Sequence, residues 1–343
     1  MNKILIRNFC TNIKNESTKP LIDNIYKNIL KDNFKIVEIK DCKNNRGLFY
    51  NPIESPTQTL SVINPKTNKP NLIFKEEPFI SYPSIIKSNE NICNHCLKEI
   101  KKEEEEIKQE CEECKVYKYC SIECKEKSSI EYHSVLCKST GSGFNYLEKH
   151  ASIEKRRFPL LAGKILARMI MGYHLEKSSK STWLPLQMLS FAKKPPPLEW
   201  KDDYLIFSRS LLKGINNESM KKKFDYDWFV RVMQILYLNT IGIDIDPNQQ
   251  STKMSSPESG IGLYLLTSFI NHDCDPNAFI HFPDDHTMHL SPLKPINPGD
   301  EITISYTDTT KDLVDRRSQL FENYGFNCEC KKCLNDLLIK RNK

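Results

Sequence analysis

The pattern of apolar and polar residues predicts strands near the start of the chain. Residues 35–40 alternate apolar and charged side chains, which is the period of a half-buried strand. Residues 44–49 then form a turn into a second strand, and strand character returns over residues 71–80. Between them, residues 51–70 are rich in Pro, Ser, Thr and Asn and have little periodicity, so they predict an inserted surface loop.

Helical periodicity dominates the middle of the chain, from residue 157 to residue 237. Two stripes of apolar residues recur at spacings of three and four, and we expect both to lie in the core. The first consists of Phe158, Leu161, Ile165, Met169 and Ile170, and the second of Phe229, Val232, Met233, Leu236 and Tyr237. Short strands follow at 279–282, 288–290 and 302–304. Strands, an insert, helices and then strands predict an α+β fold with segregated sheets and helices.

Composition favours a folded protein of one large domain with an insert, or of two domains. The 343 residues are 39% hydrophobic, which is enough to build a core. No apolar run approaches the length of about eighteen residues that a membrane span needs. The net charge of +6 is mild, and a nucleic-acid partner would rest on charge alone, as at Lys221, Lys222 and Lys223.

The first residues bear on the compartment. Residues 1–14 mix apolar and basic side chains and predict a surface helix or strand; the alternative is a mitochondrial presequence, although such segments are richer in Arg and Ser. The sequence has no secretory signal pattern. An intracellular location, cytoplasmic or nuclear or both, is therefore expected, and a reducing compartment disfavours disulfides among the thirteen cysteines.

Residues 93–137 contain seven cysteines and one histidine in four pairs. Eight such ligands suit two tetrahedral zinc ions, because residues two or three apart reach one ion from a single turn. The alternatives are disulfides or an iron–sulfur site, which would not need four regular pairs. A segment this short cannot build a sufficient core, so metal binding would supply its folding free energy. The pairs are Cys93 with Cys96, Cys111 with Cys114, Cys120 with Cys124, and His133 with Cys137. The charged run at 101–110 predicts a solvated hairpin or helix between ligands.

A second cysteine group, Cys328, Cys330 and Cys333, lacks the fourth ligand of a closed zinc site. Cys10 and Cys42 are unpaired and far upstream. Cys274 would by itself be read as a buried free thiol, but it is better explained as the missing ligand.

Cys274 lies inside one of two polar segments that suggest a pocket. The segments are Asn271-His272-Asp273-Cys274-Asp275-Pro276-Asn277 and the run from Pro298 to Tyr306, a turn that leads into a strand. Taken singly, Asn271 is typical of a turn, His272 of a core and Tyr306 of packing at a strand end. Together with the cysteine group they predict a pocket with amide and imidazole groups, a tyrosine in its wall and a metal holding the tail over it.

The order Asn-His-x-Cys-x-Pro-Asn, Gly-Asp-Glu-Ile-x-Ile-Ser-Tyr, Cys-x-Cys-x2-Cys resembles the SET-domain protein lysine methyltransferases. The first cysteine group is similar, ligand by ligand, to the MYND zinc finger. A finger inserted in a SET domain resembles the SET and MYND domain-containing (SMYD) family, over residues 34–335. The resemblance implies an α+β fold of SET-domain β-sheets with a helical insert, an inserted MYND zinc finger and a zinc-binding post-SET tail.

The resemblance also implies five consecutive segments along the chain. Residues 1–92 form the N-terminal part of the SET domain, with the extra loop at about 51–70, and residues 93–137 form the MYND finger. Residues 138–240 form a helical linker and insert, 241–310 the C-terminal SET core, and 311–343 the post-SET segment.

The resemblance also implies three zinc ions and their ligands, whereas spacing alone does not separate interleaved from sequential pairing. One ion would be shared by Cys93, Cys96, Cys120 and Cys124, and the second by Cys111, Cys114, His133 and Cys137. The third would be bound by Cys274, Cys328, Cys330 and Cys333.

The implied activity is methyl transfer from S-adenosylmethionine to the side-chain amine of lysine in a protein substrate, histone or not. The cofactor carries the reactivity, and the protein supplies binding and orientation. The resemblance assigns cofactor binding to Arg46, Gly47, Asn239, Asn271, His272 and Phe326, and the substrate channel to Ile241 and Tyr324. The phenol of Tyr306 would orient the attacking nitrogen. No strong general base is needed, because a desolvated channel disfavours the ammonium form.

Three departures from the family pattern limit what is implied. Asp273 stands where serine is commonest, and Ile241 stands where relatives often place an aromatic, which alters how many methyl groups fit. Many SMYD proteins also continue into a helical C-terminal domain beyond the third cysteine group, so we expect a more exposed groove here and leave the substrate open.

The alternative function is a non-enzymatic adaptor, in which the MYND finger binds a partner peptide, typically proline-rich, on a degenerate SET scaffold. The presence of Asn239, Asn271, His272, Tyr306 and Phe326 favours the enzyme. We expect a monomer with no membrane segment, and nucleic-acid binding is not favoured.

Overall fold

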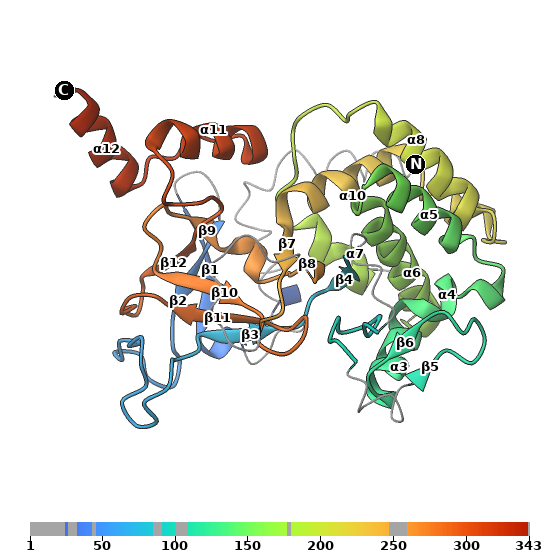
Figure 1. The fold of residues 1–343 in the computed structure, drawn as a ribbon, viewed down its shortest axis with the longest axis horizontal. Coiled ribbons are helices and arrows are strands. Elements are labelled where there is room, and N and C mark those ends of the chain that lie inside the picture. The colour runs from blue at the N-terminus through green and yellow to red at the C-terminus, as the bar shows by residue number, and fades with distance from the viewer. Residues whose placement is uncertain are drawn as a thin grey trace.

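The computed structural model describes residues 25–26, 33–42, 46–84, 91–100, 109–176, 180–246 and 259–341. Most of the strands lie on one side of the molecule and most of the helices on the other, with the strands β5 and β6 among the helices (Figure 1). The predicted α+β class is confirmed. The predictions for residues 1–14, and for most of the charged run 101–110, lie outside the described residues.

Three of the small sheets combine strands from distant parts of the chain. Their strand orders are β1 (Val37–Asp41), β2 (Arg46–Tyr50), β12 (Glu301–Ile304), β9 (Asn271–His272); β10 (Ala278–His281), β11 (Met288–Pro292), β3 (Phe74–Glu76); and β4 (Ile80–Pro83), β8 (Gly260–Leu263), β7 (Thr240–Ile243). All of these pairs are antiparallel except β12 with β9. Consequently Arg46 at the start of β2 comes within hydrogen-bond distance of Asn271 in the edge strand β9.

A carboxylate from β3 holds the turn that leads into β9. The Glu76 side chain is only 3% exposed, and it accepts hydrogen bonds from the Leu266 and Thr267 backbone N–H groups at 2.8 and 2.9 Å. The Thr267 hydroxyl donates a third bond at 2.6 Å. These bonds compensate the cost of burying a carboxylate, and they order the short helix η6 (Thr267–Phe269) just before Asn271.

Residues 51–70 form an exposed loop, the blue excursion at the lower left of Figure 1. One isolated bridge, Leu60 with Ile296, attaches it to the rest of the molecule, and a second, Ile63 with Pro70, closes the loop on itself. The loop therefore lies away from the helical side of the molecule.

The helical side is built around one long central helix. Its elements are α5 (Phe144–Glu154), α6 (Phe158–Glu176), α7 (Lys180–Gln187), α8 (Glu199–Phe207), η5 (Ser208–Leu212), α9 (Glu218–Lys221) and α10 (Tyr226–Asn239). The short helix η1 (Asn33–Lys35) instead contacts β1 of the first sheet. Helix α6 contacts α5, α7, α8 and α10, so it is buried on nearly all sides rather than along one stripe. Among the described helices, none combines the length and apolarity that a bilayer span requires.

The second predicted stripe is correct except at its end. Phe229, Val232, Met233 and Leu236 are buried at 2% exposure or less, whereas Tyr237 is 40% exposed. Tyr237 lies in the last turn of α10, and although it follows the buried Met233 by four residues, its side chain does not enter the core. The prediction that Tyr237 is a core residue was therefore wrong; its ring packs edge-on against Phe158 at 6.4 Å.

The cysteine-rich module packs below α6 in Figure 1. Its elements are β5 (Gln109–Glu110), β6 (Lys118–Tyr119), α3 (Ile122–Ser128), η3 (Ser129–His133), α4 (Ser134–Leu136) and η4 (Lys138–Thr140). At the interface, the buried Lys164 ammonium donates to the Ser81 carbonyl at 2.7 Å and lies 4.2 Å from the centroid of the Tyr132 ring. Burial lowers the pKa of Lys164 to about 7. A carbonyl and an aromatic face thus stabilise a lysine enclosed between the module and the helices.

The tail forms α11 (Leu313–Tyr324) and α12 (Lys331–Arg341), which lie above the first sheet in Figure 1. Asp312 caps α11 by accepting from the Val314 and Asp315 backbone N–H groups, and Gly325 ends the helix with a φ of 78°.

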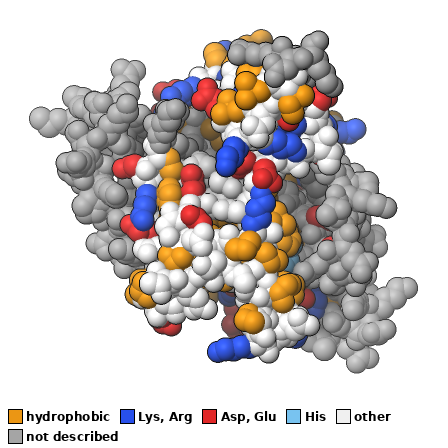
Figure 2. All heavy atoms as spheres, turned by 90° about the vertical axis from the view of Figure 1, so that its left-hand side faces the viewer, with side chains coloured by type: hydrophobic (Ala, Val, Ile, Leu, Met, Phe, Trp, Pro, Cys, Tyr) orange, Lys and Arg blue, Asp and Glu red, His pale blue; other side chains and the backbone are white. Residues whose placement is uncertain are grey.

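Figure 2 shows the face of the molecule on which α11 and α12 lie. Among the described side chains on that face, basic and acidic groups are interspersed rather than segregated, unlike the uniformly basic surface that nucleic-acid binding requires.

Candidate active site and metal centres

Three groups of four ligands bring their metal-binding atoms within 4.8 Å of one another. The groups are Cys93, Cys96, Cys120, Cys124; Cys111, Cys114, His133, Cys137; and Cys274, Cys328, Cys330, Cys333. This is the interleaved arrangement in the cysteine-rich module. The sulfur atoms of Cys96 and Cys120 are 3.6 Å apart, and those of Cys111 and Cys137 are 3.8 Å apart. A tetrahedron with Zn–S bonds of about 2.3 Å has edges of about 3.8 Å, so these donor sets fit zinc.

Local structure presents the ligands of the module. Ser121 caps α3 by accepting from the Cys124 N–H at 3.3 Å, which places Cys124 in the first helical turn beside Cys120. His133 ends η3, and its Nε2 lies 3.7 Å from the Cys114 sulfur. Burial lowers the pKa of His133 to about 4, which keeps the imidazole neutral, the form that binds a metal.

Asn271 joins three strands at the edge of the first sheet. Its Nδ2 donates to Glu301 Oε1 at 2.7 Å and to the Arg46 carbonyl at 3.2 Å. Asn271 therefore holds β2, β9 and β12 together. The contribution of Glu301 was not predicted, although the residue lies in the Gly-Asp-Glu segment that led to Tyr306.

Arg46 and Asn239, predicted to bind the cofactor, are positioned by one irregular segment after α7. The Arg46 Nη2 donates to the Met188 carbonyl, and the Asn239 Nδ2 donates to the Ser190 carbonyl at 2.7 Å. The Arg46 guanidinium also lies 5.0 Å from the centroid of the Phe269 ring. Its Nη1 is buried and has no hydrogen-bond partner among the described residues. Such an unpartnered cationic donor is suited to a carboxylate ligand. Sequence reasoning missed the 188–190 segment because it acts through backbone carbonyls.

His272 connects the third cysteine group to the predicted catalytic residue. Its Nδ1 accepts from the Tyr306 backbone N–H at 3.0 Å, and its Nε2 lies 3.2 Å from the Cys274 sulfur. Burial lowers the pKa of His272 to about 4, so the ring is neutral near pH 7. With Nδ1 accepting, the single ring proton is on Nε2 and points at the sulfur.

The Tyr306 phenol donates its proton to the Ile270 carbonyl, which leaves the oxygen lone pairs as acceptors. Burial raises the pKa of Tyr306 above its ordinary value, so the phenol stays neutral. Its ring lies 4.8 Å from the Tyr324 ring and 5.4 Å from the His272 ring, and Phe326 lies 6.2 Å from His272, measured between centroids. The structure thus brings the four predicted ring residues together.

Two further predicted residues have different surroundings. Ile241 is half-buried on β7, opposite Gly262 of β8. Gly47 lies in β2, where a Cβ atom would come within 2.5 Å of Glu301 Oε1, 2.6 Å of the Cys42 sulfur and 3.0 Å of Asn271 Nδ2. Only glycine fits beside the Asn271–Glu301 pair.

A family model for the SET domain matches residues 79–307. The chain belongs to the SET-domain family. Its relatives include the histone-lysine N-methyltransferase SMYD3 of Mus musculus, 28% identical over 271 residues, which cover 76% of this chain and 56% of that protein. The protein-lysine N-trimethyltransferase SMYD5 of Homo sapiens is 26% identical over 338 residues, covering 76% and 80% respectively. The predicted membership of the SET and MYND domain-containing family is confirmed.

A plant relative is the histone-lysine N-methyltransferase ATXR4 of Arabidopsis thaliana. It is 23% identical over 271 residues, which cover 76% of this chain and 78% of that protein. The chain therefore spans about half the length of SMYD3 but most of the length of ATXR4 and SMYD5.

Substituting Gly47 by alanine is expected to destabilise the protein by about 1–3 kcal/mol, since the added methyl group overlaps two rigidly held neighbours. Chemical denaturation measures the change. Gly214→Ala is the matched control, because a Cβ there meets nothing within 4 Å. Equal stability of the two variants would show that the strand edge adjusts freely around residue 47.

Proposed function

We propose that this protein transfers a methyl group from S-adenosylmethionine to the side-chain amine of lysine in a protein substrate. The observation that carries the proposal is the link between pocket and metal centre, in which His272 lies between the Cys274 sulfur and the Tyr306 backbone. Membership of the SET-domain family and the names of its relatives support the same activity.

The cofactor would bind between β2, β9 and the end of α10. The buried Arg46 Nη1 would pair with the carboxylate of its amino-acid end. The Asn239 amide donates two hydrogen bonds through Nδ2, to the Ser190 and Ile235 carbonyls, so its oxygen is left to accept from the cofactor's amino group. Asn271 would also lie at the amino-acid end, and Gly47 would contact the same ligand. Backbone groups near His272 would line the adenine side, and Phe326 would cover the adenine. When bound, the cofactor supplies an activated methyl group.

Tyr306 would orient the attacking amine. Because its proton is donated to the Ile270 carbonyl, its oxygen is an acceptor for an amine N–H and directs the nitrogen lone pair along the channel. Tyr324 and Ile241 would enclose the lysine stem. Desolvation there favours the neutral amine, so the raised pKa of Tyr306 is compatible with catalysis by orientation rather than by proton abstraction.

Three zinc ions would have structural roles. The eight ligands of residues 93–137 would bind two of them and supply the folding free energy of the MYND finger. Cys274, Cys328, Cys330 and Cys333 would bind the third and hold the tail over the pocket.

The proposal is tested by calorimetric titration of S-adenosylmethionine into zinc-loaded protein. We expect binding that weakens about 10-fold or more in Asn239→Ala, because a hydrogen bond to a charged group is lost. Asn323→Ala, at an exposed position of α11, serves as control and should bind normally. A folded, zinc-loaded protein that does not bind the cofactor would exclude the enzyme and favour the adaptor.

The substrate is then sought with labelled methyl groups on a protein mixture, and mass spectrometry identifies the modified side chain. Label on lysine supports the proposal, and label on another residue type contradicts it. An adaptor would instead bind a proline-rich peptide through the MYND finger without any methyl transfer, so the cofactor titration and the labelling experiment together distinguish the two functions.

A further inference from the structure

Arg316 is an arginine buried in the tail, beside the third cysteine group. It lies on α11 and is 2% exposed, one of the largest fully buried side chains among the described residues. A guanidinium is costly to remove from water unless its N–H groups are paired. Its surroundings therefore indicate what it stabilises.

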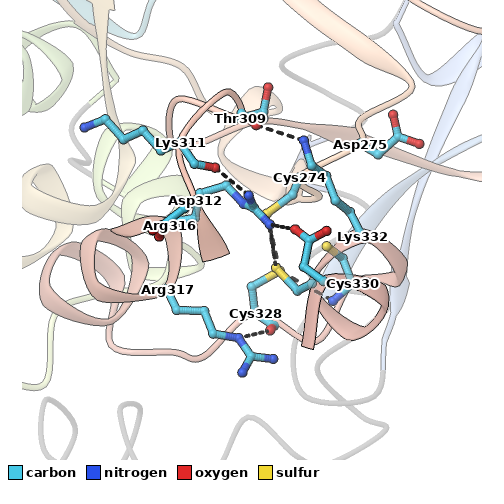
Figure 3. Close-up of polar contacts among 12 residues, drawn as sticks. Cys274, Asp275, Thr309, Lys311, Asp312, Arg316, Arg317, Cys328, Cys330 and Lys332 are labelled. Carbon is cyan, nitrogen blue, oxygen red and sulfur yellow. Dashed lines mark hydrogen bonds and ion pairs between the residues drawn. The ribbon is translucent and has the colours of Figure 1, made fainter. Parts of the chain in front are cut away.

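Its two terminal nitrogens contact three different parts of the tail (Figure 3). Nη1 donates to the Lys311 carbonyl at 2.6 Å, just before α11 begins. Nη2 donates to Asp336 Oδ2 at 2.7 Å and to the Cys333 sulfur at 3.7 Å, both on α12. One side chain thus connects the start of α11, a carboxylate of α12 and a predicted zinc ligand.

The neighbouring arginine is different. Arg317 is half-buried, and its Nε donates to the Cys328 carbonyl at 3.0 Å (Figure 3). It therefore contacts the loop between α11 and α12 through the backbone. Arg316 contacts a sulfur directly, whereas Arg317 supports the loop through the loop's backbone. A comparison of variants at these two positions therefore distinguishes the two effects.

Four thiolates around a divalent ion leave an excess of negative charge. A cationic N–H donor to one of the sulfurs stabilises that charge and orients the ligand, as outer-sphere partners of metal sites commonly do. Asp336 holds the same nitrogen, because Nη2 carries two N–H groups and donates to both the carboxylate and the sulfur.

We propose that Arg316 is a positioning residue of the third metal centre: through its bonds to Cys333, Asp336 and Lys311 it holds α11 and α12 in the arrangement that binds zinc. Since Tyr324 ends α11 and Phe326 follows it, the same contacts keep these rings beside His272 and Tyr306. The inference rests on the zinc site of the proposed function, and the two are tested separately.

The zinc content of the wild-type protein is measured first, and three equivalents per chain are expected. If the third is missing, the proposed zinc site fails, irrespective of Arg316. Competition with a chromogenic chelator is then compared for the wild type, Arg316→Gln, Asp336→Asn and Arg317→Gln. We expect the affinity for one zinc equivalent to fall about 10- to 100-fold in Arg316→Gln, less in Asp336→Asn, and to stay near wild type in Arg317→Gln.

A spectroscopic readout separates sulfur contact from general destabilisation. In cobalt-substituted protein, loss of the N–H donor should shift the sulfur-to-cobalt charge-transfer absorption of one site to lower energy in Arg316→Gln but not in Arg317→Gln. If Arg316→Gln does not fold, Arg316→Lys takes its place. It keeps the charge but cannot bond the sulfur, carboxylate and carbonyl together, so a smaller loss of affinity is expected. Wild-type zinc affinity and an unshifted cobalt spectrum in the folded variant would overturn the proposal.

Discussion

Tyr306→Phe is expected to lower kcat about 100- to 1,000-fold, comparable to the loss of one preorganised hydrogen bond at a reacting centre. The substitution keeps the ring that packs on Tyr324 and His272 and removes only the oxygen that would orient the amine. Steady-state kinetics with a methyl-accepting protein measure the loss, and calorimetry should show unchanged binding of S-adenosylmethionine.

The matched control is Tyr146→Phe, because Tyr146 is 67% exposed on α5 and its hydroxyl lies outside the pocket. It should leave kcat unchanged. A Tyr306→Phe enzyme as active as this control would show that the phenol oxygen does not orient the amine and that the ring alone suffices.

Cys274→Ser is expected to remove one of three zinc equivalents and to lower methyl transfer at least about 100-fold. Two effects combine: the third group loses a thiolate, and His272 loses the sulfur that its Nε2–H faces at 3.2 Å. With the tail released, Tyr324 and Phe326 no longer enclose the pocket. Metal analysis and activity of the purified variant measure both effects.

Asp275→Ala is the control for this variant. Asp275 follows Cys274 in the chain, but its side chain is 68% exposed and pairs with Lys294 at the surface, where ion pairs contribute little. It should retain three zinc equivalents and normal activity. Zinc content of three in Cys274→Ser would contradict the assignment of Cys274 as a ligand.

The clustering of the cysteine and histidine side chains could be predicted because its signal is local. Ligands two to four residues apart share a turn, as Cys120 and Cys124 do at the start of α3. Which pairs share an ion depended on the tertiary fold, and only the family resemblance indicated it. Cys274 was found by counting, since three thiolates require a fourth ligand.

The supports of the pocket could not be predicted, for physical reasons that differ from residue to residue. The carbonyls of Met188 and Ser190 position Arg46 and Asn239, but every residue has a carbonyl, so no side-chain pattern marks them. Glu301 alternates with apolar residues along β12 as any exposed strand residue would. Only the pairing of β12 with β9 and with β2, the latter across more than two hundred residues of sequence, turns it toward Asn271.

The position of β12 in the first sheet has a consequence for synthesis of the chain. Phe49 of β2 pairs with Glu301 of β12, about 250 residues later. At ribosomal rates of about 5–20 residues per second, β1 and β2 are made about 10–50 s before the strand that completes their sheet. During that interval the open edge of β2 offers unpaired N–H and C=O groups to other chains. The nascent protein should therefore depend on chaperones that cover exposed strand edges until Glu301 has emerged from the ribosome.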